Sequence, residues 1–191
     1  KDSFKIMFAG NIGESQDFSS ILEAARQLKG DRDIQWVILG KGRREEWVKT
    51  KIKKYALEEC FHLLGSFPIE KMPDFYNNAD AMLFSLKKEY IFSITIPAKV
   101  QTYLACGKPI LAMIDGEAAN IIYESKAGLV CPSGDSVQLS KNILKISGMS
   151  SQELFEMGNN SLNYYKKNYE RKMLLDKVEN IFSKVINIKI S

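Results

Sequence analysis

Short apolar runs alternate along the chain with longer segments in which apolar residues recur every three or four positions. The short runs are typical of strands buried on both faces, and the longer pattern is typical of amphipathic helices. Strands are predicted at residues 5–9, 36–39, 61–64, 81–84, 109–113 and 128–130. Helices are predicted between them at residues 18–28, 46–55, 98–105 and 118–124.

The last third of the chain is predicted to be helical. Asp135 with Gln138 and Ser150 with Glu153 have the spacing of capping boxes, which open helices. A final amphipathic helix is expected at about residues 170–186, with an apolar stripe made by Leu174, Val178, Ile181, Phe182 and Val185. Strands that alternate with helices across short loops predict a doubly wound α/β domain with a parallel sheet. Residues 1–191 show no linker or repeat, so a single domain is expected.

Composition agrees with one globular domain and excludes several other classes. The chain has 191 residues, 45% hydrophobic and 26% charged, and no apolar run approaches the ~20 residues needed to span a bilayer. No segment resembles a signal peptide, and the three cysteines have no zinc-binding spacing, so we expect reduced packing thiols in a cytoplasmic protein. His62 lies in an apolar stretch and is interpreted as structural.

The net charge of +4 is mildly basic. It is compatible with a phosphate-bearing ligand or an anionic membrane surface nearby, and it is too weak to indicate nucleic acid. Basic residues concentrate in residues 41–54, where apolar and acidic residues are interleaved with them. That pattern favours a solvated amphipathic helix over a binding patch.

Three segments have the composition of ligand-binding loops at the carboxyl ends of strands. In residues 10–16, Gly10 and Gly13 let a ligand approach the backbone before a helix N-terminus, although the segment could also be a plain tight turn. Residues 40–44 place Gly40 and Gly42 around a cation, which suits a ligand cleft or the start of a basic helix. In residues 95–99, free backbone donors and an ammonium group come together, as a diphosphate requires, unless the lysine simply faces solvent.

With these loops in order, the chain resembles glycosyltransferase family 4 over nearly its whole length. The resemblance is carried by the order and spacing of short pieces at residues 8–14, 39–42, 64–67, 72–76, 79–81, 96–109, 128–130 and 132–135. It implies the Rossmann-like, donor-binding half of a two-domain GT-B enzyme that binds a nucleotide sugar. The acceptor-binding N-terminal half would be absent, and the helix after Asn168 would cross back onto it.

The resemblance also implies roles for particular residues. Gly10, Asn11 and Gly13, together with Pro97, Ala98 and Lys99 at a helix N-terminus, would bind the donor diphosphate. The base and ribose would be held by Gly40, Gly42, Gly65, Ser66, Phe67 and Thr102, with the base bound largely through backbone contacts.

Two departures from the family pattern stand out. Many members carry two glutamates eight positions apart, and here those positions hold Ile94 and Thr102. The second glutamate usually holds the ribose, and Thr102 offers only a hydroxyl. The first loop lacks the family's basic residues, which are replaced by Asn11 and Gln16, so Lys99 is the leading candidate for the catalytic cation.

The mechanism implied by the family is retaining and needs neither a metal nor any other cofactor. No paired carboxylates resemble a metal-binding motif, since Glu14 and Glu117 are isolated from other acidic residues. The sequence at residues 9–14 and 96–103 is similar to the WbuB-like branch of bacterial O-antigen and capsule enzymes. That branch implies a UDP-linked, N-acetylated amino sugar such as N-acetyl-L-fucosamine, and a lipid-linked or oligosaccharide acceptor.

The sequence also leads to expectations about binding partners and cellular location, and it leaves two alternative functions open. The expected partners are the nucleotide sugar, the enzyme's own N-terminal domain and an acceptor at the membrane surface, with no nucleic acid. The protein would be cytoplasmic, with contact to the inner membrane through the missing half. The alternatives are one half of a nucleotide-sugar epimerase with the GT-B fold, and a non-catalytic α/β module that binds a nucleotide.

Overall fold

The computed structural model describes residues 3–30 and 34–190, with side chains described as far as residue 186. Residues 1–2, 31–33 and 191 of the predicted domain lie outside the described residues. The strands are β1 (Phe4–Ala9), β2 (Ile34–Leu39), β3 (Phe61–Gly65), β4 (Ala81–Ser85), β5 (Ile110–Met113) and β6 (Gly128–Cys131). Each overlaps a predicted apolar run, with ends that differ by at most two residues.

The strands form one parallel sheet in the order β3-β2-β1-β4-β5-β6. This is the strand order of a doubly wound, Rossmann-like domain, so the predicted fold class is confirmed. The chain reverses its direction of winding between β1 and β4, and ligands of such sheets bind beside that point, outside the carboxyl ends of the strands.

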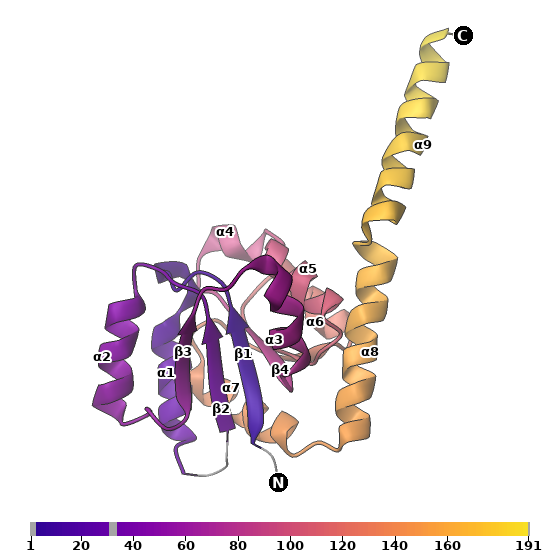
Figure 1. Cartoon of the computed structure of the whole chain (residues 1–191). Coiled ribbons are helices and arrows are strands. Elements are labelled where there is room, and N and C mark those ends of the chain that lie inside the picture. The colour runs from indigo at the N-terminus through magenta and orange to yellow at the C-terminus, as the bar shows by residue number, and fades with distance from the viewer. Residues whose placement is uncertain (1–2, 31–33, 191) are drawn as a thin grey trace.

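The helices lie on both faces of the sheet (Figure 1). They are α1 (Phe18–Gln27), α2 (Glu45–Tyr55), α3 (Met72–Asn77), α4 (Tyr90–Ser93), α5 (Ala98–Ala105), α6 (Glu117–Glu124), α7 (Ser136–Ser147), α8 (Ser151–Asn168) and α9 (Arg171–Ile190), with 3-10 turns at η1 (Glu14–Gln16) and η2 (Ile69–Lys71). The two short helices α3 and α4 were not predicted, because neither is long enough to show a helical repeat of apolar residues.

Alternate strand residues fill two separate cores. Ile6, Phe8 and Trp36 face α1, α2 and α7, whereas Met7 and Ala9 face α5 and α6. Burial on both faces explains why the strands read as continuous apolar runs. The helices cover the faces of the sheet and not the carboxyl ends of its strands, so the loops at those ends remain accessible to a ligand.

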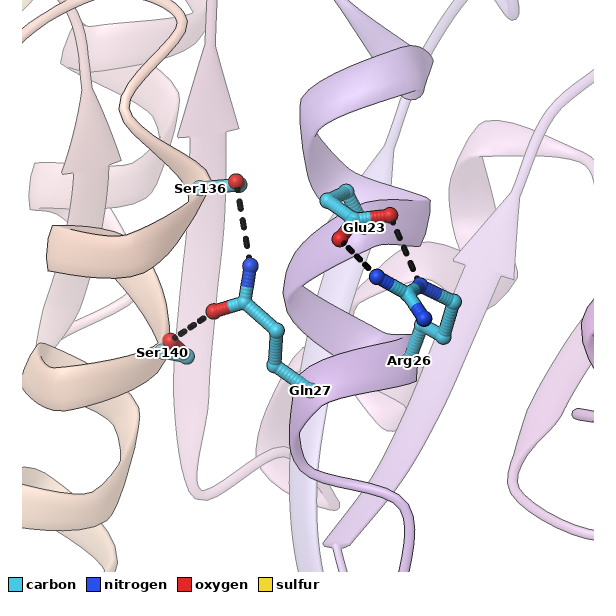
Figure 2. A network of polar contacts seen from close by, with 5 residues as sticks. All are labelled: Glu23, Arg26, Gln27, Ser136 and Ser140. Atoms are coloured by element: carbon cyan, nitrogen blue, oxygen red, sulfur yellow. Dashed lines mark hydrogen bonds and ion pairs between the residues drawn. The ribbon is translucent and has the colours of Figure 1, made fainter.

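Polar contacts join α1 to α7 over one face of the sheet. Figure 2 shows Gln27 reaching from α1 to two serines of α7: its amide nitrogen lies 3.3 Å from Ser136 Oγ, and Ser140 Oγ donates to its amide oxygen at 2.8 Å. Beside it, Arg26 makes a two-pronged ion pair with Glu23. The Gln27 contacts join α1 to α7, whereas the Arg26–Glu23 pair lies within α1.

The predicted caps of the late helices are formed, although one is simpler than expected. Ser150 and Glu153 make a full reciprocal capping box at the start of α8. Asp135 accepts the Gln138 amide at 2.8 Å, but the Gln138 side chain donates to Asn142 instead of returning to the cap. All three cysteines are free thiols, and His62 bonds Gln35 at 2.6 Å between β3 and β2.

The last helix projects away from the domain. In Figure 1, α9 continues beyond α8 and extends past the edge of the sheet at which the strands end. Its apolar side chains are exposed, among them Leu174, Val178, Ile181, Phe182 and Val185, which make up the predicted stripe. In the described part of the chain, no helix is both long and apolar enough to cross a membrane.

Candidate functional site

Backbone hydrogen bonds join the loops that follow β1, β2 and β3. Gly10 N donates to Leu39 O at 2.8 Å, and Gly40 N donates to Gly65 O at 2.7 Å. Gly40 has a φ of 135°, and a β-carbon there would overlap the Gly10 carbonyl oxygen. Only glycine lets these two loops approach so closely. Three segments that are far apart in sequence are therefore held together at one end of the sheet.

A cleft of about 330 Å³ opens between these loops and α3. It brings together five of the residues predicted to bind the donor, namely Gly10, Asn11, Gly40, Ser66 and Phe67. Lys41, the cation between the two glycines of the second candidate loop, also lines the cleft. The other lining residues were not predicted to bind a ligand and are Ala9, Leu39, Met72 and Tyr76. Burial raises the pKa of the Tyr76 phenol above its usual value, so this side chain offers a neutral hydroxyl.

Phe67 sits at the outer wall of this cleft. Its ring is 37% exposed and packs against Phe75 of α3, with ring centroids 4.4 Å apart. A partly exposed aromatic ring supported by a second ring provides a flat apolar surface, which suits a planar base. The unpredicted helix α3 thus supports a residue that the sequence had already indicated.

Three predicted glycines shape the loops and do not line the cleft. A β-carbon on Gly42 would lie 2.6 Å from Asn11 Oδ1, so this glycine lets the second loop pack on the first. Gly65 has a φ of 78°, which favours glycine. Gly13 is buried, and its amide already donates to Gln16 Oε1 at 3.1 Å. The amide of Gly13 is therefore engaged within its own loop.

The N-terminus of α5 meets the first loop at the point where the sheet reverses. Pro97 is the residue before the helix, with an extended ψ of 140°, and the helix starts at Ala98, one residue later than a proline at the first helical position would give. Val100 N bonds Pro97 O at 2.9 Å. Among the residues that the structure describes, the N–H groups of Ala98 and Lys99 have no acceptor, which makes them available to an anion.

Lys99 connects α5 to the first loop. A β-carbon on Gly10 would overlap the Lys99 ammonium, and that ammonium also lies 4.1 Å from the centroid of the Phe8 ring. Burial lowers the pKa of Lys99 to about 8, because a desolvated site disfavours the charged form. The site thus holds a partly buried cation beside free backbone donors, an arrangement that suits a phosphate group.

Tyr103 fixes α5 against the end of β1. This fully buried side chain accepts a hydrogen bond from Ala9 N at 2.8 Å and donates to Ala9 O at 3.2 Å. Burial raises the pKa of its phenol far above the usual range, so the hydroxyl stays protonated and donates. Tyr103 lies one turn after Lys99 and therefore holds in register the helix that presents the cation.

The two positions of the missing glutamate pair carry no charge and do not line the cleft. Ile94 is 52% exposed at the end of α4. Thr102 is exposed, and its hydroxyl donates to Ala98 O at 3.2 Å within α5. Among residues 3–30 and 34–186, no group of three His, Cys, Asp or Glu side chains is arranged to hold a metal ion.

A second cleft, of about 260 Å³, lies on the other side of the reversal point. Its lining comes from the segments after β4, β5 and β6 and includes Lys87, Glu89, Phe92, Asp115 and Ser133. None of its lining residues was predicted to bind a ligand, although Ser133 belongs to one of the segments that carry the family resemblance. Gly10 lines only the first of the two clefts.

This geometry agrees with the comparisons to known proteins. A family model described as "Glycosyl transferases group 1" matches residues 3–148. The chain belongs to the group 1 glycosyl transferases. Among curated members, it is 29% identical over 175 residues to the probable glycosyltransferase WbjE of Pseudomonas aeruginosa, covering 89% of this chain and 42% of WbjE. It is 27% identical over 145 residues to the amylovoran biosynthesis glycosyltransferase AmsK of Erwinia amylovora, covering 75% and 36% of the two chains.

Solved structures give the same fold. The group 1 domain described here superposes with a TM-score of 0.82 on Anabaena HepE in complex with UDP, at 15% identity over 95% of this chain and 49% of HepE. It superposes with a TM-score of 0.72 on the C-terminal domain of the group 1 enzyme LpcC from Francisella tularensis, at 19% identity over 88% and 87% of the two chains. The fold corresponds to one half of a GT-B glycosyltransferase. The chain also spans less than half the length of WbjE and AmsK.

Proposed function

We propose that this chain is the donor-binding domain of a retaining, metal-independent glycosyltransferase of family 4. The observation that carries the proposal is the contact of the Lys99 ammonium with Gly10, beside a cleft of about 330 Å³. In this assignment the base and ribose occupy the cleft near Ser66 and Phe67. The diphosphate lies at the reversal point, where the amides of Ala98 and Lys99 are available.

The same groups would assist the chemical step in the complete enzyme. When the bond between the anomeric carbon and the diphosphate oxygen breaks, negative charge develops on the diphosphate. Donors that are already in place stabilise that charge without reorganising, and one such contact is worth roughly 2–4 kcal/mol in a transition state. Lys99 would be the catalytic cation, with the N-terminus of α5 adding to its effect.

The donor proposed here is a UDP-linked, N-acetylated amino sugar such as N-acetyl-L-fucosamine. The resemblance to the WbuB-like branch supports the sugar, and the UDP complex of HepE supports the nucleotide. The acceptor would be lipid-linked or an oligosaccharide in the synthesis of a bacterial surface polysaccharide. AmsK, a relative named for amylovoran biosynthesis, supports that setting.

The partner of the exposed helix α9 would be the acceptor-binding half of the same enzyme. Apolar side chains such as Ile181 and Phe182, each about 60% exposed, would be covered there. An apolar stripe of this kind on a free-standing binding module would remain exposed to water, which is unfavourable. The direction of α9, past the edge of the sheet at which the strands end (Figure 1), supports a position of that half over the site.

Calorimetric titration of the chain with UDP, GDP and ADP tests the assignment. UDP should bind more tightly than GDP and ADP, because the base is expected to contact the loop at residues 65–67. Absence of binding by all three nucleotides would contradict the proposed function. Equal binding of all three would retain a nucleotide site and overturn the UDP assignment.

A further inference from the structure

One carboxylate joins three loops at the carboxyl end of the sheet. Glu14, just after Gly13, makes an ion pair with Lys87 from the loop after β4. Its other oxygen lies 3.1 Å from Nη1 of Arg44, at the start of α2. Hydrogen bonding to Lys87 and the nearby positive charges hold the pKa of Glu14 below its usual value, so the carboxylate is ionised at neutral pH.

The backbone around these side chains is fixed by further hydrogen bonds. Lys87 N donates to Ser15 O at 2.8 Å, and the fully buried Ser85 hydroxyl donates to Gln16 O at 2.6 Å. Arg44 N donates to Ile12 O at 3.0 Å. The loops would therefore stay joined if the ion pairs were broken, and the ion pairs are not needed merely to hold the loops together.

The group of three side chains has one positive charge in excess. Lys87 and Arg44 contribute two cations, and Glu14 neutralises only one of them. Lys87 also lines the cleft of about 260 Å³ beside the reversal point, so its side chain borders space that a ligand can enter. The side chains of Lys87 and Glu14 are 35% and 62% exposed. An exposed ion pair contributes little free energy, and a new partner can replace one member at low cost.

Arg44 has a different environment. Its guanidinium lies 3.9 Å from the centroid of the Trp47 ring on the same helix, which restrains it independently of Glu14. If Lys87 left Glu14, the carboxylate would still face Arg44. The arrangement therefore allows one cation to be released while the carboxylate stays neutralised.

We propose that Lys87 is a second cation for the donor diphosphate and that Glu14 holds it until the donor binds. The diphosphate and Glu14 then compete for the same ammonium group, and Arg44 retains Glu14 after the exchange. This inference rests on the proposed function. Lys87 would provide a positive charge beside a first loop that has Asn11 and Gln16 in place of basic residues. Glu14 acts through Lys87 and is a positioning residue.

The test compares UDP binding by the chain and three variants in calorimetric titrations at low salt. Lys87→Ala should weaken UDP binding about ten-fold or more, as expected for the loss of one charge-assisted hydrogen bond. Glu14→Gln should strengthen it about two- to five-fold, because the competing ion pair is removed. Lys172→Ala removes an equal charge from an exposed ion pair on α9 and should leave UDP binding unchanged.

The proposal predicts that Glu14→Gln and Lys87→Ala change UDP affinity in opposite directions, which a purely structural role of the ion pair would not produce. If Glu14→Gln and Lys87→Ala weaken UDP binding together, or if Lys87→Ala behaves like Lys172→Ala, the exchange is refuted. Uridine, which has no phosphate, should bind all four proteins equally, and an effect of Lys87→Ala on uridine would also refute it. If Lys87→Ala lowers the melting temperature, Lys87→Met repeats the test with a variant that keeps a long aliphatic side chain and lacks only the charge. A chain that binds no UDP refutes the proposed function itself, whereas UDP binding that is indifferent to Lys87 refutes only this inference.

Discussion

The Lys99 ammonium occupies the space that a β-carbon of Gly10 would need. Gly10 is the first residue after β1 and has a φ of 148°, and Lys99 is the second residue of α5, so the contact joins segments 89 positions apart. The absence of a side chain at residue 10 is thus what gives the cation its place. The account of the site depends on this relationship.

Gly10→Ala should weaken UDP binding by about ten-fold or more. The added methyl group displaces the Lys99 ammonium, and alanine is also strained at this φ. Titration calorimetry measures the effect. Gly30→Ala is the matched control, since Gly30 also has a positive φ of 86° but has nothing within 4 Å of an added β-carbon. If both variants bind UDP like the parent chain, the close approach has no role in binding.

Lys99→Ala should lower UDP affinity by about ten-fold or more while the protein remains folded. A charge-assisted hydrogen bond is lost, whereas the fold loses a cation whose burial was unfavourable. Calorimetry and a thermal melt measure the two quantities separately. Lys145→Ala, on the exposed side of α7, is the control for net charge. Unchanged affinity would remove Lys99 from the site.

UDP binding should weaken as the pH rises through about 8. Burial lowers the pKa of Lys99 to about 8, so its ammonium form predominates below that pH and its neutral form above it. Because bound diphosphate stabilises the ammonium form of Lys99, the pH at which half of the UDP affinity is lost should lie above 8. Titrations between pH 6.5 and 9.5 measure the profile. The arginine of Lys99→Arg stays charged over this range. If UDP affinity falls with pH in that variant as it does in the parent chain, a group other than Lys99 causes the loss.

Tyr103→Phe should lower the free energy of unfolding by about 1–3 kcal/mol. It removes both hydrogen bonds to Ala9 and leaves a buried N–H without an acceptor. Urea unfolding measures the change. Tyr123→Phe is the control, because that ring is 80% exposed and should shift stability by less than about 0.5 kcal/mol. A loss no larger than that of the control would show that the Tyr103 hydroxyl does not support α5.

The elements could be predicted where one physical signal dominates. Burial on both faces made the six strands visible as apolar runs, and an apolar stripe marked α1 and α9. The short helices α3 and α4 carry no such signal, since neither spans two full helical turns. Their positions depend on tertiary contacts, such as that of Phe75 with Phe67.

Of the five glycines predicted to bind the donor, the candidate cleft is lined by Gly10 and Gly40, and its polar contacts were less predictable. Gly10 and Gly40 stand out because each directly follows a strand, and Lys99 stands out as a cation at a helix start; the structure brings all three together. Glu14 reads as an isolated carboxylate in the sequence, yet it pairs with Lys87, 73 positions away. Such a pair depends on strand order, which places β4 beside β1, and no local pattern encodes that.

A crystal of this chain with bound UDP tests the central claim most directly. The account predicts that the diphosphate lies within hydrogen-bond distance of the Lys99 ammonium and the Ala98 amide, with the base beside Phe67. A well-ordered UDP molecule elsewhere on the protein, with the loops at residues 10–13 and 97–99 empty, would contradict it.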